Sequence, residues 1–211
     1  MAFESETAVF AVVVAFAIVA LAVFLRWSGY LIWLAGRLFA LPGVVIHEFA
    51  HKCACDLVGV PVVEVVYFRF GDPAGYVRHA RPERYRASFT ISVAPFLVNT
   101  VVSFWLFLAL AALVSTVGDL RTARPWVLTS AIALGWFALS IGIAAVPSTG
   151  DANTLWNRSR SEWRRSPIVL LGIPVVLVIY VANLLSWLWA DVLYALAIGL
   201  IAFYLFGLAP I

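Results

Sequence analysis

The stretch that decides the fold is residues 30–51, which read YLIWLAGRLFALPGVVIHEFAH. It is apolar over the length of a transmembrane helix, since about twenty residues cross the hydrocarbon core. It ends in the pentad HEFAH at 47–51. Histidines four apart on a helix lie one turn above each other and can direct two ring nitrogens at one metal ion. The stretch therefore predicts a membrane helix with a zinc site near its C-terminal end.

Glu48, the second residue of the pentad, points about a quarter-turn away from the two histidines on a helix. From there it can reach a water molecule at the metal without being a ligand. This is the position of a general base in metal-assisted hydrolysis. The pentad therefore favours a hydrolytic zinc site, with His47 and His51 as ligands and Glu48 as the catalytic base.

The composition of the chain is that of an integral membrane protein. Of its 211 residues, 64% are hydrophobic and 12% are charged, and the mean hydropathy is +1.01. A soluble domain needs far more surface charge. Six segments approach the length of a transmembrane helix, at roughly 8–25, 30–51, 88–114, 126–146, 168–187 and 192–209. We therefore expect an all-α polytopic membrane protein of about six transmembrane helices, with residues 1–211 in a single membrane domain.

A strand-rich segment follows the pentad. Residues 62–70 are rich in β-branched and aromatic side chains, residues 71–75 read GDPAG, and residues 76–79 can return as a second strand. This pattern predicts a small β-hairpin. Its exposed edge could add an extended peptide as a further strand, or the hairpin could merely pack against the membrane face.

The basic residues indicate how the chain crosses the membrane. They gather in two loops, 52–86 and 157–166, which the positive-inside rule places in the cytoplasm together with both termini. We expect a multi-pass protein of the cell membrane with its site near the cytoplasmic side. Arginines at 158–165 suit anionic lipid headgroups. The net charge of +3 reflects this topology, and we expect no nucleic-acid partner.

A third metal ligand must come from elsewhere, because catalytic zinc usually has three protein ligands and an open fourth position. Asp151 is the first choice, since the segment 126–146 is parallel to 30–51 under this topology and its final turn brings the carboxylate to the same leaflet. Alternatively, Asp151 caps the short helix that starts near Ala152.

Other candidate ligands follow the pentad. Those considered are Asp56, Glu64, Asp72 and His79. His79 is chemically the best of them, although neighbouring arginines disfavour a dication there. Cys53 and Cys55 lack the spacing of a zinc knuckle and are expected to be buried thiols.

These features resemble the site-2 protease family of intramembrane zinc metalloproteases. The resemblance covers 30–155 and includes the pentad, the strand-rich segment, a helix that opens with APFLVN at 94–99, and a parallel helix that ends in an aspartate. It implies that His47, His51 and Asp151 bind one zinc ion per chain. It also implies that Glu48 activates water.

The chain departs from the family pattern in three places. Asp151 is preceded rather than followed by glycine, and Ile143 stands eight residues before it where the family often has asparagine. Asn99 comes one residue later than in the family motif. It is a candidate for polar support of the site, or it forms a purely structural bond between helices.

The resemblance implies hydrolysis of peptide bonds in or near transmembrane segments. The expected partners are a membrane-protein or peptide substrate and the lipid bilayer. Residues 30–155 would form the metalloprotease core, with flanking helices and a loop at 1–29 and 156–211. Two other interpretations are a non-catalytic membrane protein with a structural or degenerate zinc site, and a small cation transporter.

Overall fold

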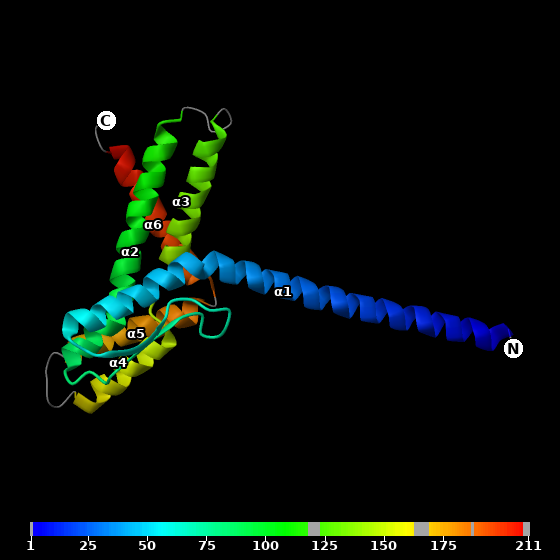
Figure 1. The fold of residues 1–211 in the computed structure, drawn as a ribbon, viewed down its shortest axis with the longest axis horizontal. Helices are drawn as coiled ribbons and strands as arrows, with labels where there is room; N and C mark the ends of the chain where they lie inside the picture. The colour runs from blue at the N-terminus through cyan, green and yellow to red at the C-terminus, as the bar shows by residue number, and fades with distance from the viewer. Residues whose placement is uncertain (1, 118–122, 163–168, 187, 209–211) are drawn as a thin grey trace. The chain divides into compact units, whose positions relative to one another are not determined.

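The computed structural model describes residues 2–117, 123–162, 169–186 and 188–208 (Figure 1). In chain order the elements are α1 (Ala2–Val58), β1 (Val62–Val66), β2 (Tyr76–His79), α2 (Tyr85–Ser115), α3 (Pro125–Ile143), α4 (Thr149–Glu162), α5 (Val169–Ser186) and α6 (Ala190–Leu208). The predicted helical fold with one small hairpin is confirmed.

Several helices have the length and composition of membrane spans. Among the described residues they are Val12–Val58, Tyr85–Ser115, Pro125–Ile143 and Ala190–Gly207. The segment Gly172–Ser186 is apolar but shorter. These four long apolar helices indicate a membrane-embedded protein. Their number is smaller than the six membrane spans predicted. The main difference is that the predicted spans 8–25 and 30–51 are joined in α1, because residues 26–29 between them contain no proline and one glycine, Gly29, which costs a helix only about 1 kcal/mol.

The chain divides into two compact units, Met1–Phe39 and Ala40–Ile211. In the first unit, Tyr30 of α1 contacts two other aromatic side chains of the same helix. Tyr30 meets Trp27 edge-on at 6.3 Å and stacks on Trp33 at 5.9 Å between ring centroids. All the features described below belong to the second unit, and the predicted single domain over 1–211 stays a prediction.

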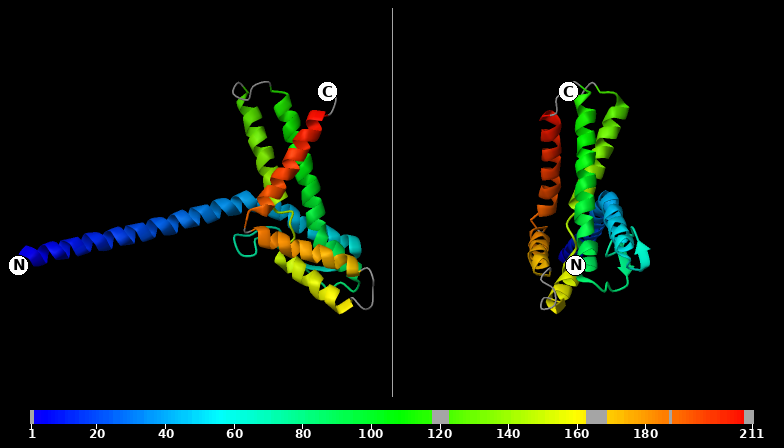
Figure 2. Two further views of the ribbon diagram at one scale, coloured as in Figure 1. Left: turned by 180° about the vertical axis from the view of Figure 1, so that it is seen from behind. Right: turned by 90° about the vertical axis from the view of Figure 1, so that its left-hand side faces the viewer.

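In the second unit, α2, α3 and α6 pack side by side (Figure 2). A Cβ atom on Gly142 of α3 would lie 2.8 Å from the Ser103 Oγ of α2 and 2.9 Å from the Ala195 Cβ of α6. Ser103 also donates a hydrogen bond to the Ala138 carbonyl at 2.8 Å. Small residues and hydroxyl groups at such contacts let membrane helices approach closely.

Helices α4 and α5 lie side by side, and α4 also contacts α2 (Figure 1). The buried Tyr85 hydroxyl of α2 lies 3.0 Å from the Ser159 Oγ of α4. The Tyr180 hydroxyl of α5 donates to Asn153 Oδ1 of α4 at 2.5 Å. The polar helix α4 is thus attached to two apolar helices by side-chain hydrogen bonds.

Helix α1 is terminated by Gly59, whose φ of +71° places it in the left-handed region. The Val60 N–H donates to the Cys55 carbonyl at 2.9 Å and the Gly59 N–H to the Asp56 carbonyl at 3.3 Å. These are the two bonds of a Schellman motif, which favours glycine at this position. The motif ends the helix shortly after the pentad and turns the chain toward β1.

The hairpin that follows pairs β1 with β2 in antiparallel register, with Val66 opposite Tyr76 and Val62 opposite His79. The predicted hairpin is confirmed, but its first strand is shorter than the predicted 62–70. Arg69 binds the carbonyls of Asp72 at 3.2 Å and Pro73 at 2.9 Å. These bonds fold 67–75 into a compact loop instead of a longer strand.

Candidate metal centre

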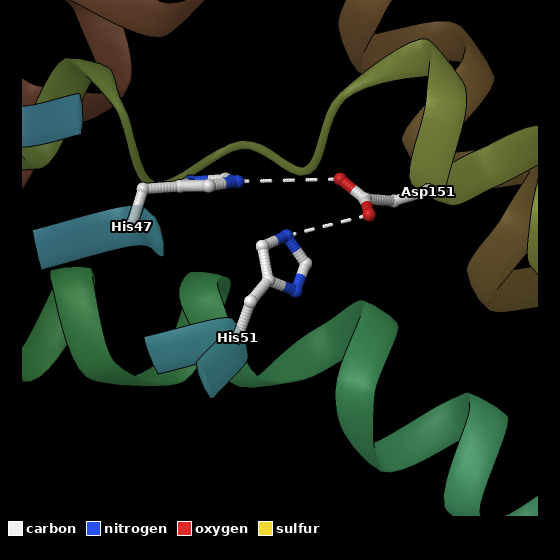
Figure 3. A group of neighbouring side chains, drawn as sticks. All are labelled: His47, His51 and Asp151. Atoms are coloured by element: carbon white, nitrogen blue, oxygen red, sulfur yellow. Dashed lines mark ion pairs between the residues drawn. The ribbon is translucent and has the colours of Figure 1, made fainter. Parts of the chain in front are cut away.

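The two histidines of the pentad and Asp151 lie together. His47 and His51 project from α1, and Asp151 from the first turn of α4 (Figure 3). One potential ligand atom from each of the three residues lies within 4.8 Å of the other two. His51 Nε2 is 3.4 Å from Asp151 Oδ1, and His47 Nε2 is 4.0 Å from Asp151 Oδ2. The structure therefore brings together the three residues proposed as ligands from the sequence.

Backbone carbonyl groups orient both rings. His47 Nδ1 lies 2.7 Å from the Ala144 carbonyl oxygen, and His51 Nδ1 lies 2.9 Å from the Ile91 carbonyl oxygen. Because a carbonyl oxygen only accepts hydrogen bonds, each Nδ1 carries the hydrogen. Nε2 is the atom that faces Asp151: in a protonated ring it donates to the carboxylate, and in the neutral ring that binds a metal it carries the lone pair. Histidine ligands of metals are usually held in this way.

Asp151 is held by Ser148, the residue just before α4. Ser148 donates to Asp151 Oδ2 from its backbone N–H at 3.0 Å and from its hydroxyl at 2.7 Å. The Asp151 N–H returns a bond to Ser148 Oγ at 3.2 Å. This reciprocal arrangement resembles a capping box, with Ser148 as the cap. The predicted helix start near Ala152 is therefore three residues late, because Ser148 takes the capping position.

The surroundings of Asp151 favour its charged form. Burial raises the pKa of this carboxyl, but the hydrogen bond with His51, the charge of a protonated His51 and the hydrogen bond from Ser148 outweigh burial and hold the pKa below its ordinary value of 3.8. The N-terminus of α4 adds a favourable dipole. Asp151 is therefore ionised at neutral pH, which is the state in which a carboxylate binds metal.

The donor set fits a zinc ion. Two neutral imidazoles and a carboxylate are common zinc ligands, and bonds of about 2.0–2.1 Å in a tetrahedron place neighbouring ligands about 3.3 Å apart. The 3.4 Å between His51 and Asp151 agrees with this spacing, the 4.0 Å between His47 and Asp151 is wider, and the whole group lies within 4.8 Å. Three protein ligands would leave one tetrahedral position for water, as in catalytic sites.

The three side chains line a cavity of about 600 Å³ that also contains Glu48. Glu48 is only 8% exposed. The hairpin loop covers this part of the cavity, because a Cβ atom on Gly75 would lie 2.7 Å from Glu48 Cγ and 2.9 Å from Val44 Cγ1. Glycine at position 75 is thus what allows the loop to rest against the predicted general base.

Asn99 supports the site from α2. It is fully buried, and its Nδ2 lies 3.0 Å from the Ala144 carbonyl oxygen, 3.3 Å from that of Ile141 and 3.4 Å from that of Gly43. The Ala144 oxygen also accepts the hydrogen bond of His47 Nδ1. The predicted bond between helices is present, and one of its acceptors is the carbonyl that contacts His47, whereas a role of Asn99 in supporting the site stays a prediction.

The competing ligands lie outside the group of three. Asp56 pairs with Lys52 at 2.5 Å. Glu64 accepts bonds from Tyr76 at 2.9 Å and Arg78 at 3.1 Å, and these two bonds lower its pKa. Asp72 and His79 line the cavity without joining the group.

The two cysteines also lie outside this group. Cys55 is buried, as predicted, but Cys53 is exposed. The prediction of two buried thiols is therefore wrong for Cys53. The two residues are two positions apart on a helix, so their side chains point in different directions.

No family model, curated protein or solved structure matches this chain. The site is therefore interpreted from its own geometry and chemistry.

Some residues of the site were not predicted from the sequence. Ser148 binds Asp151, and Asn183 of α5 donates to the Pro147 carbonyl at 2.9 Å, next to Ser148. The carbonyl groups of Ile91 and Ala144 orient the histidines. A serine three residues before an acidic residue is a capping signal that could have indicated Ser148. The sequence does not show which side chain a backbone carbonyl group meets.

Proposed function

We propose that the chain is an intramembrane zinc-dependent endopeptidase related in mechanism to the site-2 protease family, which its pentad and surrounding segments resemble. The observation that supports this most is the meeting of His47, His51 and Asp151 within 4.8 Å, in a cavity that also contains Glu48. The four long apolar helices support substrates that come from the membrane or its surface.

In this proposal, three residues bind the metal ion and a fourth transfers protons. His47, His51 and Asp151 would hold the ion. Zinc, when bound, supplies Lewis acidity that lowers the pKa of a water molecule to about 7 and polarises the scissile carbonyl. Glu48 accepts the proton of the attacking water and later delivers it to the leaving amine. Its position in the pentad allows this role, because it faces the cavity without being one of the ligands.

The hairpin provides a means of holding an extended substrate. A peptide must leave its helical conformation before its peptide bonds can be attacked, since a helix engages them in its own hydrogen bonds. Residues of β2 and of the loop before it line the cavity, among them Gly75, Val77 and His79. A substrate that added to this small sheet as a further strand would be held by main-chain hydrogen bonds beside Glu48.

The first test of the proposal is the zinc content of the detergent-purified full-length chain. We expect about one zinc ion per wild-type chain and its loss from both His47→Ala and Asp151→Ala, because removal of one of three protein ligands leaves too few. A wild-type chain that stays metal-free after zinc is supplied would refute the proposal. Zinc that persists in Asp151→Ala would show that another residue is the third ligand.

The second test separates catalysis from metal binding. Glu48→Gln removes the base but no ligand, so we expect zinc to be retained while cleavage of a membrane-protein substrate falls by about 10²–10⁴-fold. Cleavage at the wild-type rate would contradict the role of Glu48. If the wild type binds zinc but cleaves no peptide, the interpretation as a non-catalytic zinc protein is favoured. Zinc transport into sealed vesicles would instead favour a transporter.

A further inference from the structure

The hydrogen-bond partner of His51 is a backbone carbonyl group within a helix, that of Ile91. The Ile91 carbonyl lies inside α2, where a helix normally pairs each carbonyl with the N–H of the residue four positions later. That residue is Pro95, which lies within α2 and has no backbone N–H. Proline therefore leaves the Ile91 carbonyl without its helical donor.

Burial makes this carbonyl a strong acceptor for another group. Ile91 is 3% exposed and Pro95 is also buried, so bulk water is excluded from their surroundings. A buried carbonyl without a partner costs free energy comparable to a lost hydrogen bond. His51 Nδ1 lies 2.9 Å from this oxygen. The side chain of α1 thus takes the place of the missing N–H of α2.

We propose that Pro95 is a positioning residue for the metal centre. By removing the competing N–H, Pro95 reserves the Ile91 carbonyl for His51 Nδ1 and thereby directs His51 Nε2 toward Asp151. This assignment deepens the proposed function, on which it rests, because it gives Pro95 a specific task in metal binding. The acceptor for His47 Nδ1, the Ala144 carbonyl, needs no proline. It follows the last residue of α3, where carbonyl groups lack helical N–H donors.

The test is Pro95→Ala, with zinc affinity measured by competition against a chelator. Alanine restores the N–H, so the Ile91 carbonyl can pair within its own helix. We expect zinc to bind about 10- to 100-fold more weakly, the usual effect of losing an outer partner of a metal ligand. Helix propensity favours alanine over proline, so this variant is expected to fold, and Pro95→Ser restores the same N–H as a second variant.

A matched control is Pro174→Ala, because Pro174 lies inside α5 and the residue four positions before it is not a partner of either histidine. We expect unchanged zinc affinity in this control. A double-mutant cycle makes the test specific to His51. In a His51→Cys background, which keeps a ligand but removes Nδ1, Pro95→Ala should change zinc affinity by less than about two-fold.

Two results would overturn the inference. One is an unchanged zinc affinity in Pro95→Ala, and the other is an equal loss of affinity in the wild-type and His51→Cys backgrounds, which would indicate a general structural effect. NMR of ¹⁵N-labelled histidine in the metal-free chain gives an independent readout. The hydrogen-bonded Nδ1 proton of His51 should be lost in Pro95→Ala, and its persistence would overturn the inference even if the wild type bound no zinc.

Discussion

At the scale of single residues, the cavity contains three side chains that could hold a metal ion and others that lie apart from them. All three histidines of the chain line this cavity, yet His79 lies outside the group of ligand atoms. Its Nδ1 lies 2.8 Å from the carbonyl oxygen of the next residue, Ala80. The His79 ring is therefore bound to the backbone just after β2 and not to the two pentad histidines.

This arrangement predicts that His79→Ala keeps the zinc that His47→Ala loses. The removed ring is not one of the three ligands, so we expect a metal content equal to that of the wild type, measured by atomic emission on the purified protein. The comparison with His47→Ala controls for nonspecific loss. Loss of zinc from His79→Ala would assign the third ligand to His79.

Gly75 gives a second prediction at this scale. In Gly75→Ala the new Cβ would meet Glu48 Cγ at 2.7 Å and Val44 Cγ1 at 2.9 Å, so either the loop or the base must shift. Misplacement of a catalytic group by about 1 Å can lower a rate by about 10²-fold. We expect a loss of cleavage of about 10-fold or more with zinc retained.

The control for this prediction is Gly71→Ala in the same loop. Its Cβ would approach Arg69 Nε no closer than 3.4 Å, an ordinary contact. Equal rates for Gly75→Ala and Gly71→Ala would mean that the loop does not hold Glu48 in place.

At the scale of elements, α5 holds the segment that presents Asp151. Asn183 donates to the Pro147 carbonyl at 2.9 Å, and Tyr180 binds Asn153 at 2.5 Å. Pro147 and Asn153 lie on either side of Asp151 in the sequence. An apolar helix that contributes none of the three proposed ligands thus holds the segments on either side of Asp151 through two polar side chains.

Asn183→Leu should therefore weaken zinc binding by about 10-fold, because the turn before α4 loses its attachment to α5. The chelator competition used for Pro95→Ala measures this effect. Ser186→Ala is a suitable control, since the Ser186 hydroxyl bonds within its own helix to the Ala182 carbonyl at 3.0 Å. Identical affinities for the two variants would contradict the role given to Asn183.

At the scale of the whole molecule, the distribution of basic residues predicts the direction in which the chain crosses the membrane. The predicted topology places the end of α1 on the cytoplasmic side. Cys53, two residues after the pentad, is exposed, whereas Cys55 is 0% exposed. A membrane-impermeant maleimide should therefore modify Cys53 in sealed inside-out vesicles and leave it unmodified in right-side-out vesicles.

Cys53→Ser provides the control, because it leaves Cys55 as the remaining cysteine and should abolish labelling. Labelling of Cys53 from the outer side alone would reverse the predicted topology. The metal centre would then lie near the outer boundary, and the zinc measurements would be unaffected.

The sequence by itself determined the features that depend on neighbouring residues. Hydropathy over about twenty residues indicated the apolar helices, and the alternation of strand and turn residues indicated the hairpin. The spacing of His47 and His51 placed two ring nitrogens on one helix face. The joining of two predicted spans in α1 was missed because hydropathy cannot distinguish one long helix from two helices separated by a short break such as residues 26–29.

The tertiary structure decided everything that required distant segments to meet. Asp151 and His79 were both compatible with the sequence, and the position of the first turn of α4 brings Asp151, not His79, to the pentad histidines. The carbonyl partners of the two rings come from α2 and the end of α3. Such partners are backbone atoms, whose availability depends on where a helix ends or where a proline interrupts it, and which side chain reaches them depends on three-dimensional packing.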